Sequence, residues 1–456
     1  MGKLAVYAGD PLEDANDRLT WDALDIRREG DKVGSARLNG ANATRPVNFT
    51  WTFDEERWYW FTLPMASTTA NATFLNGEKA TLSDKWYLAE YDGAQRVTNG
   101  DGDNWPFCEP ATLTPGKGYI IAWDGIPSGF TKQTLVMPMT GYTENANKSV
   151  TVYAYGAGTD AAANRVGWNV IGDPYLEYYC TKDGNPFTAL LTGSVSRVDG
   201  TWTRSGSVPY VTIPINGGED YYQQLITETD LSPFTSFFVQ IGGSSDREEL
   251  DLIFNSSTRN KRSVVARAPQ EESNDPIIAT LVLSNGNSQS DETSMVVWEN
   301  FNDTYEVGGD LVKMKGDNYK NSERPTLYSL HESGELAFQA TNEAGAARTT
   351  PLGYYTKLNG EHVFSLKENV DLSLFESIIL VDNELGVRHN LLLGNYTFSA
   401  MAEENTTRFG IEIHLRKNPI VTGMQNSTES FGTTPRKIIY DDKLFILVGG
   451  KVYDGT

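Results

Sequence analysis

A stretch that occurs twice limits what this chain can fold into more than any other feature of its sequence. An aromatic segment leads into Pro64 in the first copy and into Pro174 in the second. In each copy an Asp-Gly pair follows, at Asp92 and at Asp199, and a Leu-x-Pro turn then runs into an apolar segment. Aromatic and β-branched segments between proline and Asp/Gly turns are typical of strands. The sequence therefore predicts a duplicated β unit whose length differences fall in loops.

Composition favours the same fold class throughout the chain. The 456 residues include 22 Tyr, 19 Phe, 10 Trp and 42 Gly, and long helical periodicity is absent. A chain of this length can form two or three domains, each with its own core. We expect an all-β protein with duplicated β-rich, sandwich-like units, followed by a β-sandwich of the jelly-roll or immunoglobulin-like kind. A short C-terminal β-meander completes the expected architecture.

Changes in the pattern mark the expected boundaries. A polar stretch of mixed charge, almost free of large apolar residues, is the clearest boundary because such stretches are typical of exposed linkers. The expected segments are N-terminal strands over residues 1–54, the first repeat copy over 55–150, the second over 151–254, the linker over 255–275, the β-sandwich over 276–416 and the meander over 417–456.

The charge of the chain excludes some partners. The formal net charge is −22, so the surface repels nucleic acid and anionic membranes. No run of about 18 apolar residues occurs, so the sequence predicts no transmembrane helix. Such a protein suits an exposed setting or one that meets cations.

One loop has the composition of a calcium site. Asn99, Asp101 and Asp103 alternate with glycines, and oxygen side chains at this spacing can wrap a calcium ion. Calcium is the one cofactor that the sequence suggests. The loop is not an EF-hand, because Pro110 stands near the position where that motif has its bidentate glutamate. The alternative is a solvated hairpin loop, because Asn, Gly and Asp are also the usual turn residues.

Tryptophans are the candidate ligand contacts. Trp58 or Trp60 recurs at the position of Trp168 in the second copy, and this recurrence favours core packing. Trp105 and Trp202 lie beside Gly, Asp and Ser loops and are the two expected to be exposed. Exposed aromatic faces stack on sugars, so these two residues are candidates for glycan binding, with a structural role as the alternative.

The remaining candidate chemistry is sparse. Cys108 and Cys180 each lie in a different copy, so one disulfide between the copies is open, as are two separate thiols. A Cys-x-x-Cys pair, a Gly-x-Ser-x-Gly elbow and a phosphate-binding Gly-x-x-x-x-Gly-Lys loop are all missing from the sequence. The sequence nominates no catalytic residue, and we expect a protein that is not an enzyme.

Several of these patterns resemble a known group, the large surface and secreted proteins of Bacteroidetes. The resemblance rests on turns and strands at Trp168 to Tyr175, Tyr91 to Gly93, Pro115 to Ile121, Leu380 to Asp382, Tyr396 to Phe398 and Lys437 to Asp454. In such proteins β-sandwiches often precede a C-terminal sorting domain of the type IX secretion kind, and residues 437–454 are similar to the start of that domain. The resemblance implies an extracellular or cell-surface location and carries over no active-site residues.

Two functions follow from these observations. The first is a non-enzymatic cell-surface or secreted bacterial protein that serves adhesion or presents an upstream domain, with host or microbial glycans or surface proteins as partners. The alternative is a carbohydrate-binding module region of a larger secreted protein or glycan-active enzyme.

Overall fold

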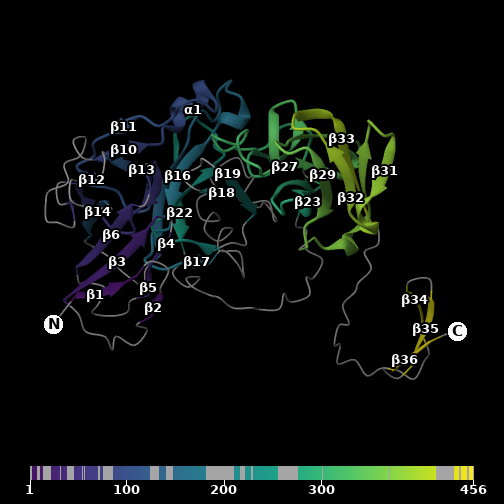
Figure 1. Ribbon diagram of the computed structural model, residues 1–456, viewed down its shortest axis with the longest axis horizontal. Helices are drawn as coiled ribbons and strands as arrows, with labels where there is room; N and C mark the ends of the chain where they lie inside the picture. The colour runs from purple at the N-terminus through teal and green to yellow at the C-terminus, as the bar shows by residue number, and fades with distance from the viewer. Residues whose placement is uncertain are drawn as a thin grey trace. The chain divides into compact units, whose positions relative to one another are not determined.

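The computed structural model is all-β, which confirms the expected fold class (Figure 1). Among the described residues only two α-helices occur, α1 (Gly93–Asn99) and α3 (Glu343–Ala346). The chain divides after Arg416 into a large unit of residues 1–416 and a small unit of residues 417–456. The structure describes residues 3–7, 11–13, 22–30, 32–37, 46–53, 55, 57–69, 72–74, 86–123, 133–139, 147–180, 210–215, 221–226, 230–254, 276–299, 301–368, 370–416, 436–440, 443–448 and 451–454.

The N-terminal segment joins the sheet of the first repeat. Its strands are β1 (Lys3–Val6), β2 (Pro11–Glu13), β3 (Ala23–Glu29), β4 (Lys32–Val33) and β5 (Ser35–Arg37). β1 pairs in parallel with β3, and β3 pairs in parallel with β6 (Val47–Phe53). β6 lies before the boundary expected at residue 54, yet it pairs with β14 and thus belongs to the first repeat. Strands are present before residue 54 as expected; β1, β3 and β4 extend the sheet of the repeat, whereas β2 and β5 pair with each other.

Among the described residues the two repeats have corresponding strands in the same order, except that β9 of the first repeat has no counterpart in the second. The first contains β6, β7 (Tyr59–Thr62), β8 (Ser67–Thr68), β9 (Thr73–Phe74), β10 (Trp86–Glu90), α1, β11 (Phe107–Cys108), β12 (Thr112–Leu113), β13 (Gly118–Trp123) and β14 (Gln133–Met139). The second contains β15 (Lys148–Ala154), η3 (Ala163–Arg165), β16 (Trp168–Gly172), β17 (Tyr179–Cys180), β18 (Tyr210–Ile215), β19 (Tyr221–Ile226), β20 (Asp230–Leu231), β21 (Ser236–Gln240) and β22 (Glu248–Phe254).

The pairing of these strands also agrees, pair by pair. In the first repeat β6 pairs with β14, β7 with β13, β8 with β12, and β10 with both β13 and β11. In the second repeat β15 pairs with β22, β16 with β21, β17 with β20, and β18 with both β21 and β19. Apart from the β9–β14 pair, every antiparallel pair described in one repeat has its counterpart in the other, so the duplication read from the sequence is one of strand topology.

Equivalent positions of the two repeats bind each other. The Leu-x-Pro turn places Gly116 and Phe234 at the same position of their repeats, and both have left-handed backbone, with φ of 71° and 61°. Thr62 and Gly172 both end the strand that pairs with the strand after this turn. The N–H of Thr62 donates to the carbonyl of Phe234 (3.2 Å), and the N–H of Gly172 donates to the carbonyl of Gly116 (2.8 Å). Such reciprocity is the mark of an isologous interface, so an approximate two-fold axis relates the repeats.

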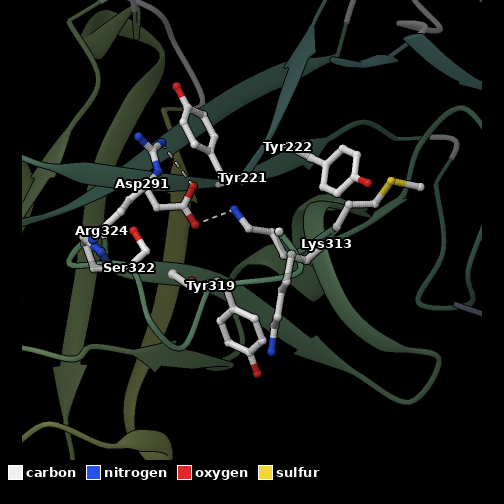
Figure 2. Close-up of a pocket in the computed structure, with 12 residues that line it drawn as sticks. Tyr221, Tyr222, Asp291, Lys313, Tyr319, Ser322 and Arg324 are labelled. Atoms are coloured by element: carbon white, nitrogen blue, oxygen red, sulfur yellow. Dashed lines mark hydrogen bonds and ion pairs between the residues drawn. The ribbon is translucent and has the colours of Figure 1, made fainter. Parts of the chain in front are cut away.

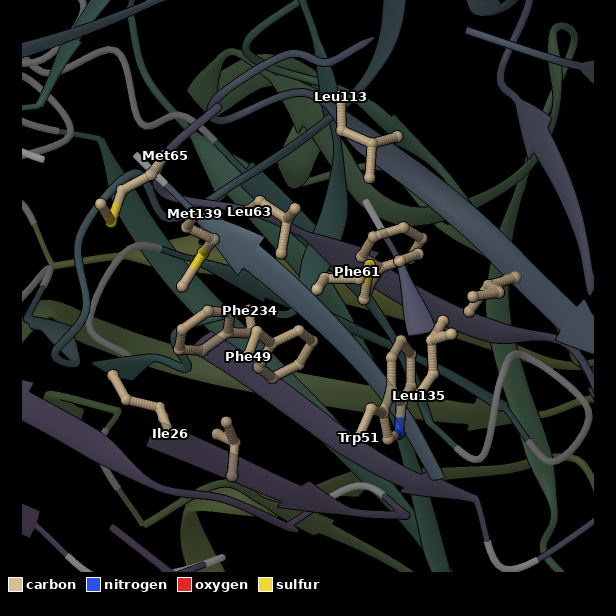
Figure 3. Close-up of a cluster of buried hydrophobic side chains, with 14 of the residues drawn as sticks. Ile26, Phe49, Trp51, Phe61, Leu63, Met65, Leu113, Leu135, Met139 and Phe234 are labelled. Atoms are coloured by element: carbon tan, nitrogen blue, oxygen red, sulfur yellow. The ribbon is translucent and has the colours of Figure 1, made fainter. Parts of the chain in front are cut away.

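Phe234 of the second repeat also enters the core of the first. Its ring stacks on Phe49 with centroids 4.3 Å apart, inside the cluster shown in Figure 3. The buried Arg28 donates to the carbonyls of Trp60 (3.0 Å) and Phe234 (3.1 Å), and its guanidinium lies 4.1 Å from the ring centroid of Trp51. This one arginine joins the backbones of both repeats.

The domain from residue 276 onward is one curled sheet around a single core. Its elements are β23 (Ile277–Asn285), β24 (Ser290–Val297), β25 (Leu311–Val312), β26 (Thr326–His331), β27 (Gly334–Thr341), α3, β28 (Thr350–Tyr355), β29 (Gly360–Leu366), η6 (Leu372–Leu374), β30 (Phe375–Asp382), β31 (Val387–Asn390), η7 (Leu391–Leu393), β32 (Tyr396–Ala400) and β33 (Glu404–Leu415). The order is β31-β30-β33-β28-β26-β27-β24-β23-β29-β32, with β25 on β27. Both halves of the sheet cover the same apolar cluster, which gives it sandwich character.

A buried ion pair joins opposite ends of this sheet. Arg408 on β33 donates to Asp382 on β30 (2.9 Å) and to the carbonyl of Ser399 on β32 (3.1 Å), and Tyr396 on β32 also donates to Asp382 (3.0 Å). β32 and the β30–β33 pair lie at opposite ends of the strand order, so these bonds draw the sheet toward closure. Burial, the largest single influence, would raise the pKa of Asp382. The hydrogen bonds from Arg408, from the N–H of Leu385 and from Tyr396, together with the positive charge of Arg408, outweigh it and hold that pKa below its ordinary value.

The second repeat and the domain from residue 276 onward share a hydrophobic cluster, which also includes residues of the first repeat. Tyr210 stacks on Phe338 at 4.3 Å and donates its hydroxyl to the carbonyl of Gly309 (2.6 Å). Gln224 donates to the carbonyl of Val312 (2.6 Å) and accepts the N–H of Met314 (2.9 Å). These buried bonds explain why residues 1–416 form one unit.

The small unit is a three-stranded antiparallel sheet. Its strands are β34 (Arg436–Tyr440), β35 (Lys443–Val448) and β36 (Lys451–Asp454), paired in sequence order. This is the meander expected over residues 417–456.

The close contact between the repeats at Gly118 predicts that a larger side chain there destabilises the protein. A Cβ on Gly118 would overlap Cγ1 of Val170 and lie 2.9 Å from Cβ of Ser236. We expect Gly118→Val to lower the free energy of unfolding by about 2 kcal/mol or more, since overpacking forces the strands apart. Denaturant unfolding followed by tryptophan fluorescence measures it. Gly286→Val, at a turn position with open space, is the control, and equal effects of the two would contradict the tight contact.

The ion pair at the sheet ends predicts a second effect. Arg408→Met leaves the carboxylate of Asp382 buried without its cation, and we expect a loss of about 3 kcal/mol. Because the pKa of Asp382 is lowered in the folded state, the stability due to this pair is present above pH 3.8 and disappears as the pH falls through the lowered value. The difference from wild type in thermal unfolding should therefore narrow in acid. Arg348→Met removes an exposed pair with Asp303 and should change little.

Candidate functional site

Of the two tryptophans expected to be exposed, Trp105 is half-buried. Its ring meets Trp60 edge-on at 4.7 Å and Tyr91 at 5.1 Å, so neighbouring aromatics fix its orientation. Trp202 lies outside the described residues. A glycan contact by either residue stays a prediction, and for Trp105 the structure shows an aromatic neighbourhood that holds the ring in place.

A group of three aromatic side chains is built around the exposed Phe107, which follows Trp105 by two residues. Phe107 is 72% exposed on β11, the edge strand of its sheet. Its ring centroid lies 5.8 Å from that of Trp58 and 6.3 Å from that of Tyr87, both half-buried. We name Trp58, Tyr87 and Phe107 the β11 aromatic surface. Sequence reasoning missed Phe107 and Tyr87, although the alternation of Trp105 and Phe107 after a polar loop was the available signal.

The predicted calcium loop is closed by its own side chains. Asp92 caps α1 by accepting the N–H groups of Ala94 and Gln95, as expected for an Asp-Gly turn, and the loop follows α1. The side-chain amide of Asn104 donates to the carbonyls of Gly100 (2.9 Å) and Gly102 (2.8 Å). The carbonyl oxygens of Gly100 and Gly102, which could otherwise coordinate a cation, therefore both accept hydrogen bonds from the amide nitrogen of Asn104.

The three predicted calcium ligands also have partners of their own. Asp101 forms an ion pair with Arg96 (2.6 Å), and Asp103 accepts the N–H of Trp105 (3.1 Å). Asn99 donates weakly to the carbonyl of Asp103 (3.5 Å). Across the part of the chain that the structure describes, His, Cys, Asp and Glu form no group of three or more that could hold a metal ion. Calcium binding stays a prediction.

The two cysteines are not joined in the structure. Cys108 is a free, half-buried thiol on β11. Burial and the nearby charge of Glu90 raise the pKa of this thiol to about 11, so it stays protonated at neutral pH. Cys180 ends β17, and its side chain lies outside the described residues. The disulfide that one cysteine per repeat suggested is therefore not seen, because the thiol of Cys108 is free.

A pocket lies where β19 meets the domain from residue 276 onward (Figure 2). We name it the junction pocket. It consists of two cavities that share Tyr221, Tyr222, Asp291, Lys313 and Arg324, one of about 100 Å³ and a smaller one of about 10 Å³, whose lining Figure 2 shows. Lys313 forms a buried ion pair with Asp291 (2.6 Å), and Lys367 pairs with Glu292 (2.8 Å). Its polar and aromatic lining includes Tyr221, Tyr222, Gln223, Gln224, Asp291, Glu292, Lys313, Lys315, Tyr319, Ser322, Arg324 and Lys367.

A carboxyl near this junction is strongly perturbed. Burial raises the pKa of Asp310 to about 7, although the N–H groups of Ala340 and Glu306 donate to it (both 2.8 Å) and favour its charged form. The same apolar surroundings raise the pKa of Tyr210. These groups belong to the buried contact between the domain and the second repeat, so their perturbation reflects packing.

Comparison with family models, with curated proteins and with solved structures finds no match to this chain. None of the helices in the described residues is long and apolar enough to cross a membrane. What the chain does must therefore be argued from its own surfaces.

The closed loop gives a test of the calcium prediction. Asn104→Ala removes two hydrogen bonds and leaves the carbonyls of Gly100 and Gly102 without the amide, so we expect a loss of about 1–3 kcal/mol. Thermal unfolding of wild type and variant in EDTA and in calcium measures it. Rescue of the variant by calcium, abolished by a second change Asp103→Ala, would identify the loop as a cation site. Equal stability of variant and wild type in EDTA would contradict the role of Asn104.

Proposed function

We propose that this protein is a non-enzymatic cell-surface or secreted bacterial protein that acts in adhesion by binding glycans. The β11 aromatic surface is the observation that supports this proposal. Large apolar side chains of the repeats are mostly buried, yet Phe107 is 72% exposed beside two further rings. An exposed aromatic side chain beside two half-buried rings has an unfavourable contact with water, and a ligand that covers this surface removes that contact.

Sugars fit such a surface because the C–H groups of a pyranose ring form an apolar face. An aromatic ring with an exposed face can stack on it, and neighbouring polar groups can bind the hydroxyls. The half-buried Tyr87 also carries a hydroxyl, and the exposed Glu109 follows directly after β11. The arrangement supports a shallow site for a saccharide on the edge of the first repeat.

The scaffold supports presentation of this surface. The reciprocal hydrogen bonds and Arg28 hold the two repeats together, and the shared cluster holds both to the domain from residue 276 onward. The resemblance of residues 437–454 to the start of a type IX sorting domain supports a surface or secreted location. A carbohydrate-binding region of a larger glycan-active protein is the alternative, and it would use the same aromatic surface.

A glycan array tests the proposal. Wild type should bind one class of glycan, and Phe107→Ala should weaken that binding about tenfold or more, since one stacking contact contributes on the order of 1–3 kcal/mol. Leu393→Ala, which removes another large exposed side chain (85%), is the matched control and should bind like wild type. Trp105→Ala reports on the predicted contact. Absence of glycan binding by wild type, or equal binding by Phe107→Ala, would refute the proposal.

A further inference from the structure

We propose that the junction pocket binds the carboxylate or sulfate group of an acidic saccharide, with Arg324 as the residue that recognises the anion. This inference concerns a second surface, and it does not depend on the β11 aromatic surface. The pocket is formed by β19 of the second repeat on one side and by the segment around residues 313–326 on the other. It exists only because the two domains are packed together.

The charge of the pocket is opposite to that of the whole chain. Among the described residues, its larger cavity is lined by three cations, Lys313, Arg324 and Lys367, and by two acids, Asp291 and Glu292. Three positive and two negative charges leave an excess of one positive charge there, in a chain whose formal net charge is −22. A positive pocket in an acidic protein attracts an anion locally while the rest of the surface repels it. The anion is therefore bound by a specific group of residues.

The lysines of the pocket already have anionic partners. Lys313 pairs with Asp291, and Lys367 with Glu292. Lys315 pairs with Glu335 (2.6 Å) and Glu404 (3.3 Å), neither of which lines the pocket. These pairs set the background charge, and a ligand would have to compete with carboxylates for each lysine.

Arg324 is differently placed. The ion-pair oxygen recorded for its guanidinium is Oδ1 of Asp291 at 3.7 Å, which is beyond hydrogen-bonding distance. That carboxylate is already held by Lys313 through its other oxygen. The side chain of Arg324 is 27% exposed, so solvent and a ligand can reach it. In the described part of the chain this ion-pair oxygen lies too far away for a hydrogen bond, so the N–H groups of Arg324 can donate to an anion.

The orientation of this fork is fixed before any ligand binds. The guanidinium carbon of Arg324 lies 3.8 Å from the ring centroid of Tyr221, and Figure 2 shows the two side chains together at the pocket. The backbone N–H of Arg324 donates to the hydroxyl of Ser322 (3.1 Å), which holds the start of the side chain. A preorganised guanidinium loses little entropy on binding and can donate two parallel hydrogen bonds to a carboxylate or sulfate.

The remaining lining suits a sugar. Tyr221, Tyr222 and Tyr319 supply ring faces and hydroxyls, and Gln223 and Ser322 supply further polar groups for sugar hydroxyls. A cavity of about 100 Å³ is too small for a ligand that fills the usual range of roughly 300–1,000 Å³. A cavity of this size can hold the acid group and one edge of a single sugar unit, while the rest of the saccharide lies outside it.

Titration calorimetry on the full chain tests this inference with three probes: glucuronate, sodium sulfate and glucose. Wild type should bind glucuronate and lose that binding as sodium chloride is raised. Glucose, which lacks the acid group, should not bind. Binding of sulfate as well as glucuronate supports recognition of the anionic group, and binding of sulfate alone assigns the site to sulfated sugars. Failure of both anions to bind, or equal binding of glucose, overturns the proposal.

Variants of Arg324 connect the binding to this pocket. Arg324→Gln should weaken anion binding about tenfold or more, because a charge-assisted pair of hydrogen bonds is lost. Arg324→Lys keeps the charge without the fork and should fall between this variant and wild type. Arg348→Gln, at an exposed arginine outside the pocket, is the matched control and should bind like wild type.

Thermal unfolding of each variant shows that it is folded. The difference in anion affinity between Arg324→Gln and Arg324→Lys does not depend on small losses of stability. Equal affinity of Arg324→Gln and wild type for glucuronate overturns the proposal. Phe107→Ala should bind glucuronate normally, so failure of the β11 aromatic surface and failure of the junction pocket give different results.

Discussion

The reciprocal contact between the two repeats is the constraint on which the large unit depends. Two backbone hydrogen bonds, from Thr62 to Phe234 and from Gly172 to Gly116, connect equivalent positions in opposite directions. Reciprocal bonds of this kind fix both the distance and the angle between two similar bodies. Arg28 reinforces them by donating to a carbonyl of each repeat, and Phe234 fills the core of its neighbour. The chain thus contains the equivalent of a dimer interface within one polypeptide.

The rest of residues 1–416 packs around the aromatic cluster that forms where the two repeats meet. Trp60 and Phe238, from the two repeats, meet edge-on at 5.1 Å, and the domain from residue 276 onward covers their cluster with residues such as Phe338. The two candidate surfaces lie beside this cluster. The β11 aromatic surface includes Trp58, which packs against it, and the junction pocket is lined by Tyr222, which does so as well. A rigid aromatic centre holds both surfaces in place, as binding sites require.

Much of the fold could be predicted from local sequence. Strands such as β23 and β26 could be predicted from local sequence because apolar residues dominate them, whereas β28 could not. β28 contains Pro351 and Gly353, which normally argue against a central strand. In the structure Pro351 lies beyond the last residue that pairs with β26, and the ring of Tyr328 occupies the space that a side chain at Gly353 would need. Only neighbours distant in sequence make these two residues acceptable there.

The sequence by itself determined the all-β class and the duplication, because these follow from aromatic and apolar segments that recur between turn residues. The linker expected over residues 255–275 lies outside the described residues. The sequence could not place the two candidate surfaces. Phe107 is exposed because β11 is an edge strand, and Arg324 lines a pocket because Tyr221 on β19 of the second repeat lies beside it. Exposure and charge pairing depend on which segments meet in space. Only the tertiary structure determines the exposure and the charge pairing of these side chains, because a local sequence pattern does not specify which distant residues will contact them.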